Sequence, residues 1–345
     1  RSGRPDRRTA TDHRQQSLVN VVRAVRAARP RFNHHHASRR FHRQRILNLN
    51  SSILMSLIGT LGSGVSALRT FMKGLEVIGN NIANVNTTGF KSSTAEYVDS
   101  FSNVLQRSAP GVPPASNTPA LAVGTGVKLG AIHTNYSQGS LETTGAGTDL
   151  GISGEGYFHV QNPVDGTEYA TRDGSFRWDD QGSLVNGQGY SVMGLTGAGL
   201  ATVGPIKLGT PPAGTQLQSV TIDKSGNVVE FYSDGTSATT NQVQLQKFTD
   251  QSALVPEGNN LFSGLLAAGP VGAASGSSAF QAGGANAPGS NGLGAIQSGT
   301  LELSNVDLTD QFANLITTQR SFQAGSRLIT VSDSVLDDIV NLKRS

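Results

Sequence analysis

The sequence has no cysteine, few aromatic residues and no long apolar run. The absence of cysteine excludes disulfide bridges, thiolate metal sites and thiol nucleophiles. Aromatic residues make up only 6% of the chain, and no stretch reaches the roughly 18 apolar residues that a membrane-spanning helix needs. Glycine is abundant instead, with 42 residues in 345, which indicates many turns and a thin core. We therefore expect no membrane insertion.

Charge is distributed unevenly along the chain. Residues 1–54 contain 13 Arg and only two acidic residues, whereas residues 55–345 contain 14 basic and 22 acidic side chains. The formal net charge of +3 therefore averages two different segments, and a boundary is predicted at Met55. The acidic remainder does not suit nucleic-acid binding, which requires basic surfaces.

Three interpretations of residues 1–54 are open. The segment is a basic arm that binds phosphates, an Arg-rich transit-type peptide, or translated sequence upstream of a start at Met55. We favour the third and expect a disordered or non-native extension. The consecutive His34, His35 and His36 are interpreted as a solvated tract and not as a metal site.

Apolar residues near both ends of the acidic segment recur at alternating intervals of four and three. This 3.5-residue period is typical of helices that pair through one seam. Several glycines weaken the first helix, which therefore needs a partner surface. The predicted seam residues are Leu61, Val65, Leu68, Met72, Leu75 and Ile82 near the start and Leu308, Phe312, Leu315, Phe322, Ile329, Leu336 and Val340 near the end.

Two explanations fit these stripes. They are ordinary core faces, or the two ends of the chain pair with each other as a coiled coil. The second is favoured, because the stripes flank a middle region of a different kind. Lys343 and Arg344 follow the last stripe, where cations suit the end of a helix.

The middle of the chain is predicted to be β. Short apolar runs, such as residues 156–160 and 242–248, are separated by Asp-Gly, Ser-Gly and single-Gly turn signals. We expect a mixed α and β fold with terminal helices and an antiparallel all-β sandwich or partial barrel between them. The expected segments are an N-terminal helix with a signature motif (55–100), an extended connector (101–120), β structure (121–263), a Gly/Ala/Ser-rich loop (264–300) and a C-terminal helix (301–345).

The sequence offers no recognisable catalytic chemistry. After Met55 only His133 and His159 remain, each within a strand-like run. There is no Gly-Lys dipeptide for a phosphate-binding loop, and GISGEG at 151–156 lacks the second glycine of a nucleophile elbow. We therefore predict no catalytic, cofactor-binding or metal-binding residues, and no enzyme.

The stretch ALRTFMKGLEVIGNNIANVNTTGFKSS at 67–93 resembles the N-terminal signature of the bacterial flagellar rod and hook protein family. Residues 298–344 resemble the other end of that family, and GTGVKLGAI and YATRDGSFRWDDQGSLVNGQGYSVMG resemble its β region. The motif residues are Asn80, Asn81, Asn84, Asn86, Thr88, Gly89, Phe90 and Lys91. By residue type, the asparagines suit a helix end and Gly89 suits a helix-terminating position.

The resemblance implies a structural subunit that polymerises into the tubular flagellar hook. The implied partners are further copies of the chain, rod proteins, the hook cap, hook–filament junction proteins and the type III export apparatus. The implied location is the extracellular hook or basal body, reached without a cleaved signal. A distal rod protein of the basal body is the alternative within the family. Outside it, the alternatives are a surface adhesin-like β protein and a carbohydrate-active enzyme.

Overall fold

The computed structural model describes residues 34–111, 116–197, 199–200, 202–272 and 286–342, with side chains from residue 58 onward. The chain divides into two units, Arg1–Gly59 and Thr60–Ser345, which are described separately. In the first unit, helical backbone begins at His34, so the boundary expected at Met55 falls inside a helix. Residues 1–33 lie outside the described part of the chain. All that follows concerns the second unit.

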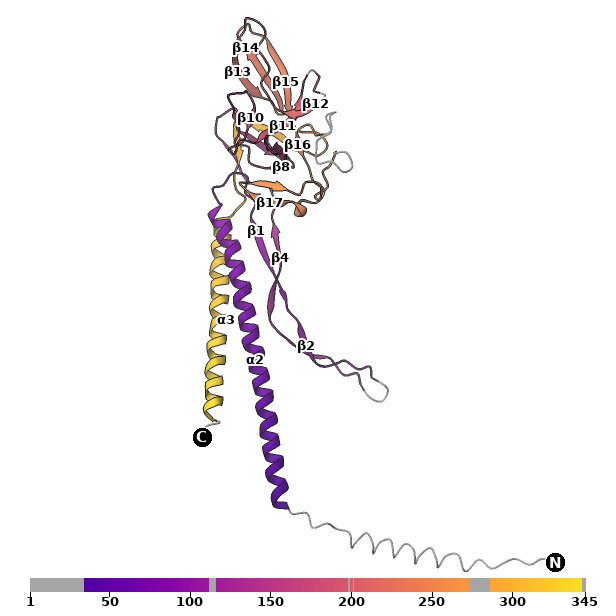
Figure 1. The fold of residues 1–345 in the computed structure, drawn as a ribbon, viewed down its shortest axis with the longest axis vertical. Coiled ribbons are helices and arrows are strands. Elements are labelled where there is room, and N and C mark those ends of the chain that lie inside the picture. The colour runs from indigo at the N-terminus through magenta and orange to yellow at the C-terminus, as the bar shows by residue number, and fades with distance from the viewer. Residues whose placement is uncertain (1–33, 112–115, 198, 201, 273–285, 343–345) are drawn as a thin grey trace, which may run out of the picture. The chain divides into compact units, whose positions relative to one another are not determined.

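Two helices lie at the two ends of the second unit. Residues 60–83 of helix α2 (His34–Ala83) run antiparallel to helix α3 (Leu308–Leu342), side by side with it (Figure 1). Thr60 Oγ1 lies 3.3 Å from Ser332 Oγ, and Asn81 Nδ2 donates to Gln311 Oε1 at 3.1 Å. Residues 60–83 together with α3 are called the helix pair below.

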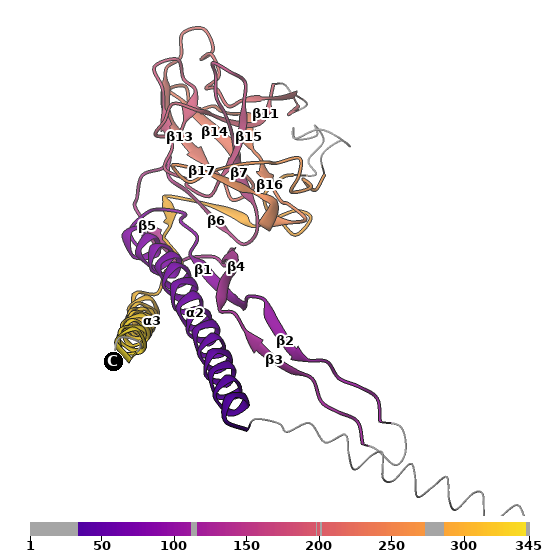
Figure 2. The same cartoon turned by 60° about the horizontal axis from the view of Figure 1, so that its bottom comes forward.

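A long hairpin, called the arm, follows α2. Strands β1 (Ser93–Asp99) and β4 (Val127–Thr134) pair antiparallel, and the ribbon continues as β2 (Ser102–Gln106) and β3 (Leu121–Gly124). Helix α2 lies between the arm and α3 (Figure 1 and Figure 2). Thr70 Oγ1 of α2 donates to the carbonyl of Val127 at 3.2 Å.

The remaining strands form the β body, residues 141–302. Its main sheet is antiparallel throughout, with the path β13-β14-β15-β11-β7-β8-β18-β17. Two further pairs, β19–β6 and β20–β5, complete it. The strands are β5 (Leu141–Thr143), β6 (Leu150–Ser153), β7 (Tyr157–Gln161), β8 (Glu168–Thr171), β9 (Arg177–Trp178), β10 (Leu184–Val185), β11 (Ser191–Thr196), β12 (Thr202–Pro205), β13 (Leu217–Ile222), β14 (Asn227–Tyr232), β15 (Ser237–Val243), β16 (Leu245–Gln246), β17 (Val255–Gly258), β18 (Leu261–Ser263), β19 (Ala295–Ser298) and β20 (Thr300–Glu302), with a 3-10 turn at Gln251–Ala253.

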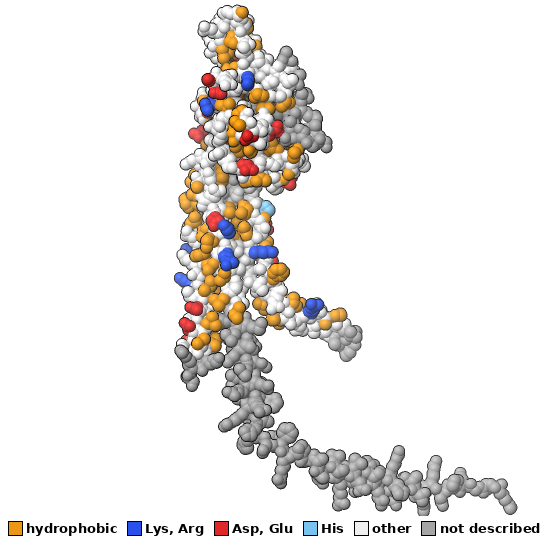
Figure 3. Space-filling view, viewed as in Figure 1, with side chains coloured by type: hydrophobic (Ala, Val, Ile, Leu, Met, Phe, Trp, Pro, Cys, Tyr) orange, Lys and Arg blue, Asp and Glu red, His pale blue; other side chains and the backbone are white. Residues whose placement is uncertain are grey.

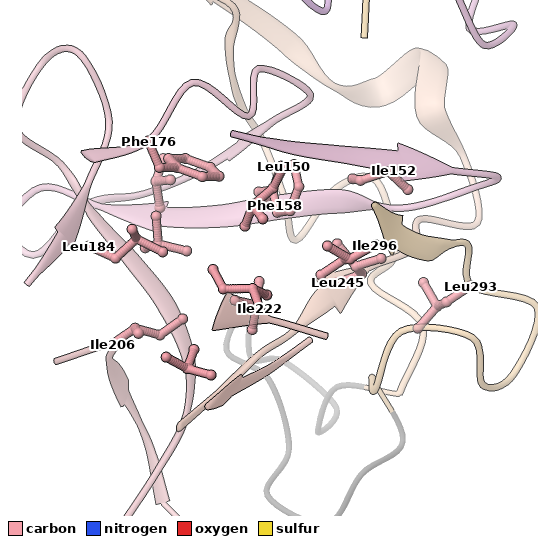
Figure 4. Packing of buried hydrophobic residues seen from close by; sticks show 14 of the residues in the cluster. Leu150, Ile152, Phe158, Phe176, Leu184, Ile206, Ile222, Leu245, Leu293 and Ile296 are labelled. Atoms are coloured by element: carbon pink, nitrogen blue, oxygen red, sulfur yellow. The ribbon is translucent and has the colours of Figure 1, made fainter. Parts of the chain in front are cut away.

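Strand β7 separates two apolar clusters. Successive side chains of a strand point to opposite faces, so Phe158 and Val160 enter one cluster while Tyr157 enters the other. In the larger cluster the Phe158 ring meets the Phe176 ring edge-on at 5.1 Å (Figure 4). These clusters hold the β body together without the helices.

The expectation of helices at both ends and a mostly antiparallel β middle is confirmed. The stretch expected to be an extended connector, residues 101–120, instead leaves and returns along the arm. Its first part forms β2, which pairs with β3 directly after the stretch, and a bridge joins Ala109 to Thr118. Within the expected Gly-rich loop, strand β19 begins at Ala295, while residues 273–285 lie outside the described residues.

Candidate functional site: the joint between the helices and the β body

Asparagine side chains close the end of α2. The Asn84 amide donates to the Asn80 carbonyl at 2.9 Å and to its side-chain oxygen at 3.0 Å. Thr87 Oγ1 then donates to Asn84 Oδ1 at 3.1 Å. Short amide side chains that bond nearby backbone compete with continued helix, so the chain turns here. Asn86 is exposed in this turn.

Gly89 brings the chain into direct contact with the end of β8. Its φ is +68°, a left-handed value that L side chains rarely adopt. A Cβ at this position would lie 2.8 Å from the carbonyl carbon of Arg172. The Gly89 N–H donates to the Glu302 carbonyl at 2.7 Å. Both the backbone conformation and the close approach therefore require glycine.

The neighbouring residue Thr88 fastens the same turn to two parts of the β body. Its hydroxyl donates to Asp173 Oδ1 at 2.8 Å, and its carbonyl accepts a hydrogen bond from the Asn260 side-chain amide. Half-buried Phe90 continues the turn, and its carbonyl accepts from the Asn305 N–H at 3.4 Å.

Three charged residues from distant parts of the chain meet in a buried cluster, called the joint. Lys91 Nζ lies 2.6 Å from Glu302 Oε1, and Arg172 Nη1 lies 3.1 Å from Glu302 Oε2. The Lys91 and Glu302 side chains are only 1% exposed, and that of Arg172 is 4% exposed. Burial lowers the pKa of Lys91, and the adjacent Glu302 carboxylate acts in the opposite direction.

Backbone groups complete the joint. Lys91 Nζ also donates to the Ser137 carbonyl at 2.8 Å, and the Gly139 N–H donates to Glu302 Oε1 at 2.9 Å. Arg172 Nη2 donates to the Gly154 carbonyl at 3.0 Å. Since buried charges are tolerated only when they are paired and hydrogen-bonded, these partners make the cluster possible.

Two asparagines tie the helix pair to the arm. Asn81 is 1% exposed; its amide donates to the Ser93 carbonyl at 2.7 Å, and its oxygen accepts from the Ser93 N–H at 2.9 Å. Asn305 mirrors this arrangement, accepting from the Ser92 N–H at 2.7 Å and donating to the Asn135 carbonyl at 2.8 Å. The end of α2 and the segment just before α3 are thus both fixed to the base of the arm, where β1 begins and β4 ends.

On α3, the half-buried and buried side chains recur at intervals of three or four residues, and only some of them are residues that were selected as a seam from the sequence. The series is Gln311, Leu315, Thr318, Phe322, Gly325, Ile329, Ser332, Leu336 and Ile339, with Ser321 half-buried beside Phe322. Small residues allow close approach: a Cβ on Gly64 would lie 2.9 Å from Ile329 Cγ1, and one on Gly325 would lie 3.4 Å from Leu68 Cδ2.

The predicted seam residues therefore separate into two groups. Half-buried in the single chain are Leu61, Leu68, Leu75, Ile82, Leu315, Phe322, Ile329 and Leu336. Exposed by at least 40% are Val65, Met72, Leu308, Phe312 and Val340. Further apolar side chains lie exposed on α3, and Figure 3 shows apolar side chains along this part of the surface. The helix pair thus presents apolar surface that the single chain does not cover.

His133 and His159, the two histidines whose side chains the structure describes, show no arrangement typical of a catalytic or metal site, while the side chains of His34, His35 and His36 lie outside the described part. His133 Nε2 lies 2.8 Å from Glu96 on the exposed arm, and buried His159 lies 3.5 Å from Glu168. Across the residues that the structure describes, no group of three potential metal ligands occurs. Nor does any helix among them have the length and apolar character needed to cross a membrane.

Sequence reasoning singled out Lys91 but not its partners Arg172 and Glu302. Both lie within segments that were quoted only for their family resemblance. A lone charge at the edge of a short strand looks like a solvated residue when its partners are distant in sequence. No signal in the chain would have distinguished it.

Three family models of known proteins match segments of this chain. The FlgE/F/G D1 domain model of flagellar hook proteins matches residues 151–230. The flagellar basal-body rod protein model matches residues 61–91, and the C-terminal model of the FlgEFG rod proteins matches residues 297–342. The flagellar basal-body rod protein FlgG of Bacillus subtilis is 38% identical over 288 residues, which cover 84% of this chain and all of that protein. The chain belongs to the flagellar hook and basal-body rod protein family.

Other relatives within the family agree. FlgG of Borreliella burgdorferi is 32% identical over 294 residues, covering 84% of this chain and all of the relative. The flagellar hook protein FlgE of Helicobacter mustelae is 40% identical over 139 residues, which are 40% of this chain and 31% of that protein. The chain is therefore a structural component of the bacterial flagellum, as expected from its motifs.

The joint lies where the three matched segments of this family meet. Lys91 is the last residue of the first segment, Arg172 lies in the second and Glu302 in the third. Each matched segment thus contributes one charge to the same buried cluster.

Proposed function

We propose that the protein is an axial subunit of the distal flagellar rod. The observation that supports this proposal is the share of each relative that the match covers. The relatives named FlgG are matched over 92% to 100% of their length. The hook relative is matched along 31% of its length. The hook remains the second candidate, favoured by the higher identity of that shorter match.

The proposed mechanism is polymerisation into a helical tube. Copies associate through one repeated contact between different surfaces, which does not close into a ring. The apolar side chains that the single chain leaves exposed, such as Met72 and Phe312, support this assembly. We propose that the helix pair is a coiled coil lining the tube and that the β body is a sandwich or partial barrel forming its wall. The role is mechanical and not enzymatic.

The proposed partners follow from this position. They are further copies of the chain, the neighbouring rod proteins and the type III export apparatus. The hook cap and hook–filament junction proteins are partners if the chain builds the hook.

Electron microscopy of basal bodies from a deletion strain tests the proposal. Without the gene, we expect truncated rods, no hooks and no swimming, and expression of the full chain should restore all three. The variant Asp337→Asn, which changes an exposed residue of α3, serves as the matched control and should complement fully. Complete rods that lack only the hook would overturn the rod assignment in favour of the hook.

A further inference from the structure

The chain passes the joint on its way out from the helix pair, again between the arm and the β body at Ser137 and Gly139, and on its return to α3. The chain leaves α2 through residues 84–92, which include Lys91, and returns to α3 through residues 302–307, which begin at Glu302. Arg172 stands at the end of β8, against Gly89. The three charges therefore belong to the outgoing segment, the returning segment and the β body itself.

The contacts at the joint are directional. Each oxygen of the Glu302 carboxylate is held by a different cation, at 2.6 Å and 3.1 Å. The Arg172 guanidinium is held in turn by the Gly154 carbonyl and lies 5.2 Å from the centre of the Tyr157 ring. Apolar contacts tolerate sliding, whereas an Arg–carboxylate contact with fixed backbone partners has one favoured geometry.

Stability alone does not explain such a cluster. Burying ions is costly, and well-packed apolar residues of similar size often stabilise a fold equally well or better. In some proteins a buried polar or ionic group instead selects one conformation over others. At this location, specificity means one orientation of the β body relative to the helix pair.

We propose that Lys91, Arg172 and Glu302 are positioning residues that fix the angle between the helix pair and the β body. This inference rests on the proposed axial role, in which a fixed angle in every subunit keeps the tube straight. Loss of the charges should therefore loosen the angle and make the tube bend, even where folding and assembly persist.

The test uses a variant in which the charges are replaced and not merely unpaired. The triple variant Lys91→Met, Arg172→Met, Glu302→Leu restores an apolar interior, and Arg172→Lys is a second variant that keeps the charges but alters their geometry. Glu230→Gln is the matched control. Glu230 is also fully buried, and it accepts from Tyr232, Thr240 and Gly209 in the β13–β15 region, away from the joint.

Because the sequence has no cysteine, spin labels are placed by Asp180→Cys in the β body and Gln323→Cys on α3, both exposed positions. Electron–electron double resonance then measures the distance distribution in the full-length chain. We expect one narrow distribution for the unmodified joint and for Glu230→Gln, and a clearly broader distribution for both joint variants. Microscopy should show straight assemblies for the control and bent ones for the joint variants.

Equally narrow distributions in the joint variants that fold would overturn the inference. If the triple variant does not fold, Arg172→Lys decides alone by the same criterion. Failure of the proposed function would look different: the deletion strain would then have normal rods, while the distance distributions would still report on the joint.

Discussion

Gly64 of α2 faces Ile329 of α3 so closely that a Cβ at Gly64 would lie 2.9 Å from Ile329 Cγ1. Nearly three turns further along α2, a Cβ at Gly74 would lie 2.0 Å from the Tyr97 hydroxyl of the arm. Glycine weakens a helix, yet at these two positions it allows α3 and the arm to approach α2. The low helix propensity of α2 is therefore linked to its contacts on both sides.

Gly64→Ala should destabilise the helix pair although alanine is the better helix former. The gain in propensity is about 1 kcal/mol, and the displacement of Ile329 outweighs it, since overpacking typically costs 1–3 kcal/mol. Gly62→Ala is the matched control, because nothing lies within 4 Å of a Cβ there. Thermal unfolding followed by helical circular dichroism should show opposite shifts for the two variants. Shifts of the same sign would contradict the close packing at Gly64.

Gly89→Ala should be more damaging than an alanine substitution at another glycine with positive φ. At Gly145, with φ +77° and no atom within 4 Å of a Cβ, alanine costs only the left-handed conformation, about 1–2 kcal/mol. At Gly89 the same cost is joined by a clash with the backbone of Arg172. Chemical denaturation should therefore show a larger loss of unfolding free energy for Gly89→Ala than for Gly145→Ala. Equal losses would show that the backbone near Arg172 moves to make room for the added Cβ.

Ionisation of Tyr232 should make the fold sensitive to alkaline pH. The hydrogen bond from its hydroxyl to Glu230, together with burial, raises the pKa of Tyr232 from 10.0 to about 12. The folded chain thus holds this proton more tightly than the unfolded chain. The stability it contributes is fully present below pH 10 and is lost as the pH rises towards 12.

Tyr232→Phe provides the measurement. The variant should be less stable at neutral pH because buried Glu230 loses one donor, and such losses cost about 1–3 kcal/mol. The gap between the two proteins should close as the pH rises through the same window. A gap that stays constant would mean that Tyr232 does not titrate in the folded chain.

The spacing of apolar residues predicted the terminal helices. It did not predict which residues of α3 lie beside Leu315, Phe322 and Ile329 on the face that packs against α2. Leu315, Phe322 and Ile329 were found by their apolar character, whereas the second row consists of the small or polar residues Gln311, Thr318, Gly325 and Ser332 and ends with the apolar Ile339. Selection by hydrophobicity chose Phe312 and Val340 for that row, and these lie outside the pair. An apolar residue on a helix indicates that another surface covers its side chain. It does not tell whether that surface belongs to the same chain or to a neighbouring subunit.

The joint shows that contacts between charged residues distant in sequence are equally hard to predict from the sequence. Lys91 and Glu302 are 211 residues apart in the sequence and 2.6 Å apart in the structure. The residue types at 84–90 are enough to predict a helix end and a glycine turn, because those depend on local backbone chemistry. The ion cluster depends on which segments the β body brings together, and local patterns do not encode that.

A substitution at Phe312 should affect assembly of the subunits but not folding of the single chain. Its side chain is 50% exposed in the single chain, whereas Leu315, one turn further along α3, is half-buried in the seam. Phe312→Ser should therefore change the free energy of unfolding of the monomer by no more than about 0.5 kcal/mol. Leu315→Ala should lower it by about 2 kcal/mol, near the lower end for a truncated core leucine.

Assembly should respond to both variants. If neighbouring copies cover Phe312, every subunit of a tube loses the same apolar contact, and rods should be shortened or absent in basal bodies of cells that carry Phe312→Ser. The comparison pairs monomer denaturation with microscopy of basal bodies, and Asp337→Asn serves again as the exposed control on the same helix. Normal rods built from Phe312→Ser would show that this apolar face is not an interface, and the tube would have to be held together by the arm or the β body instead.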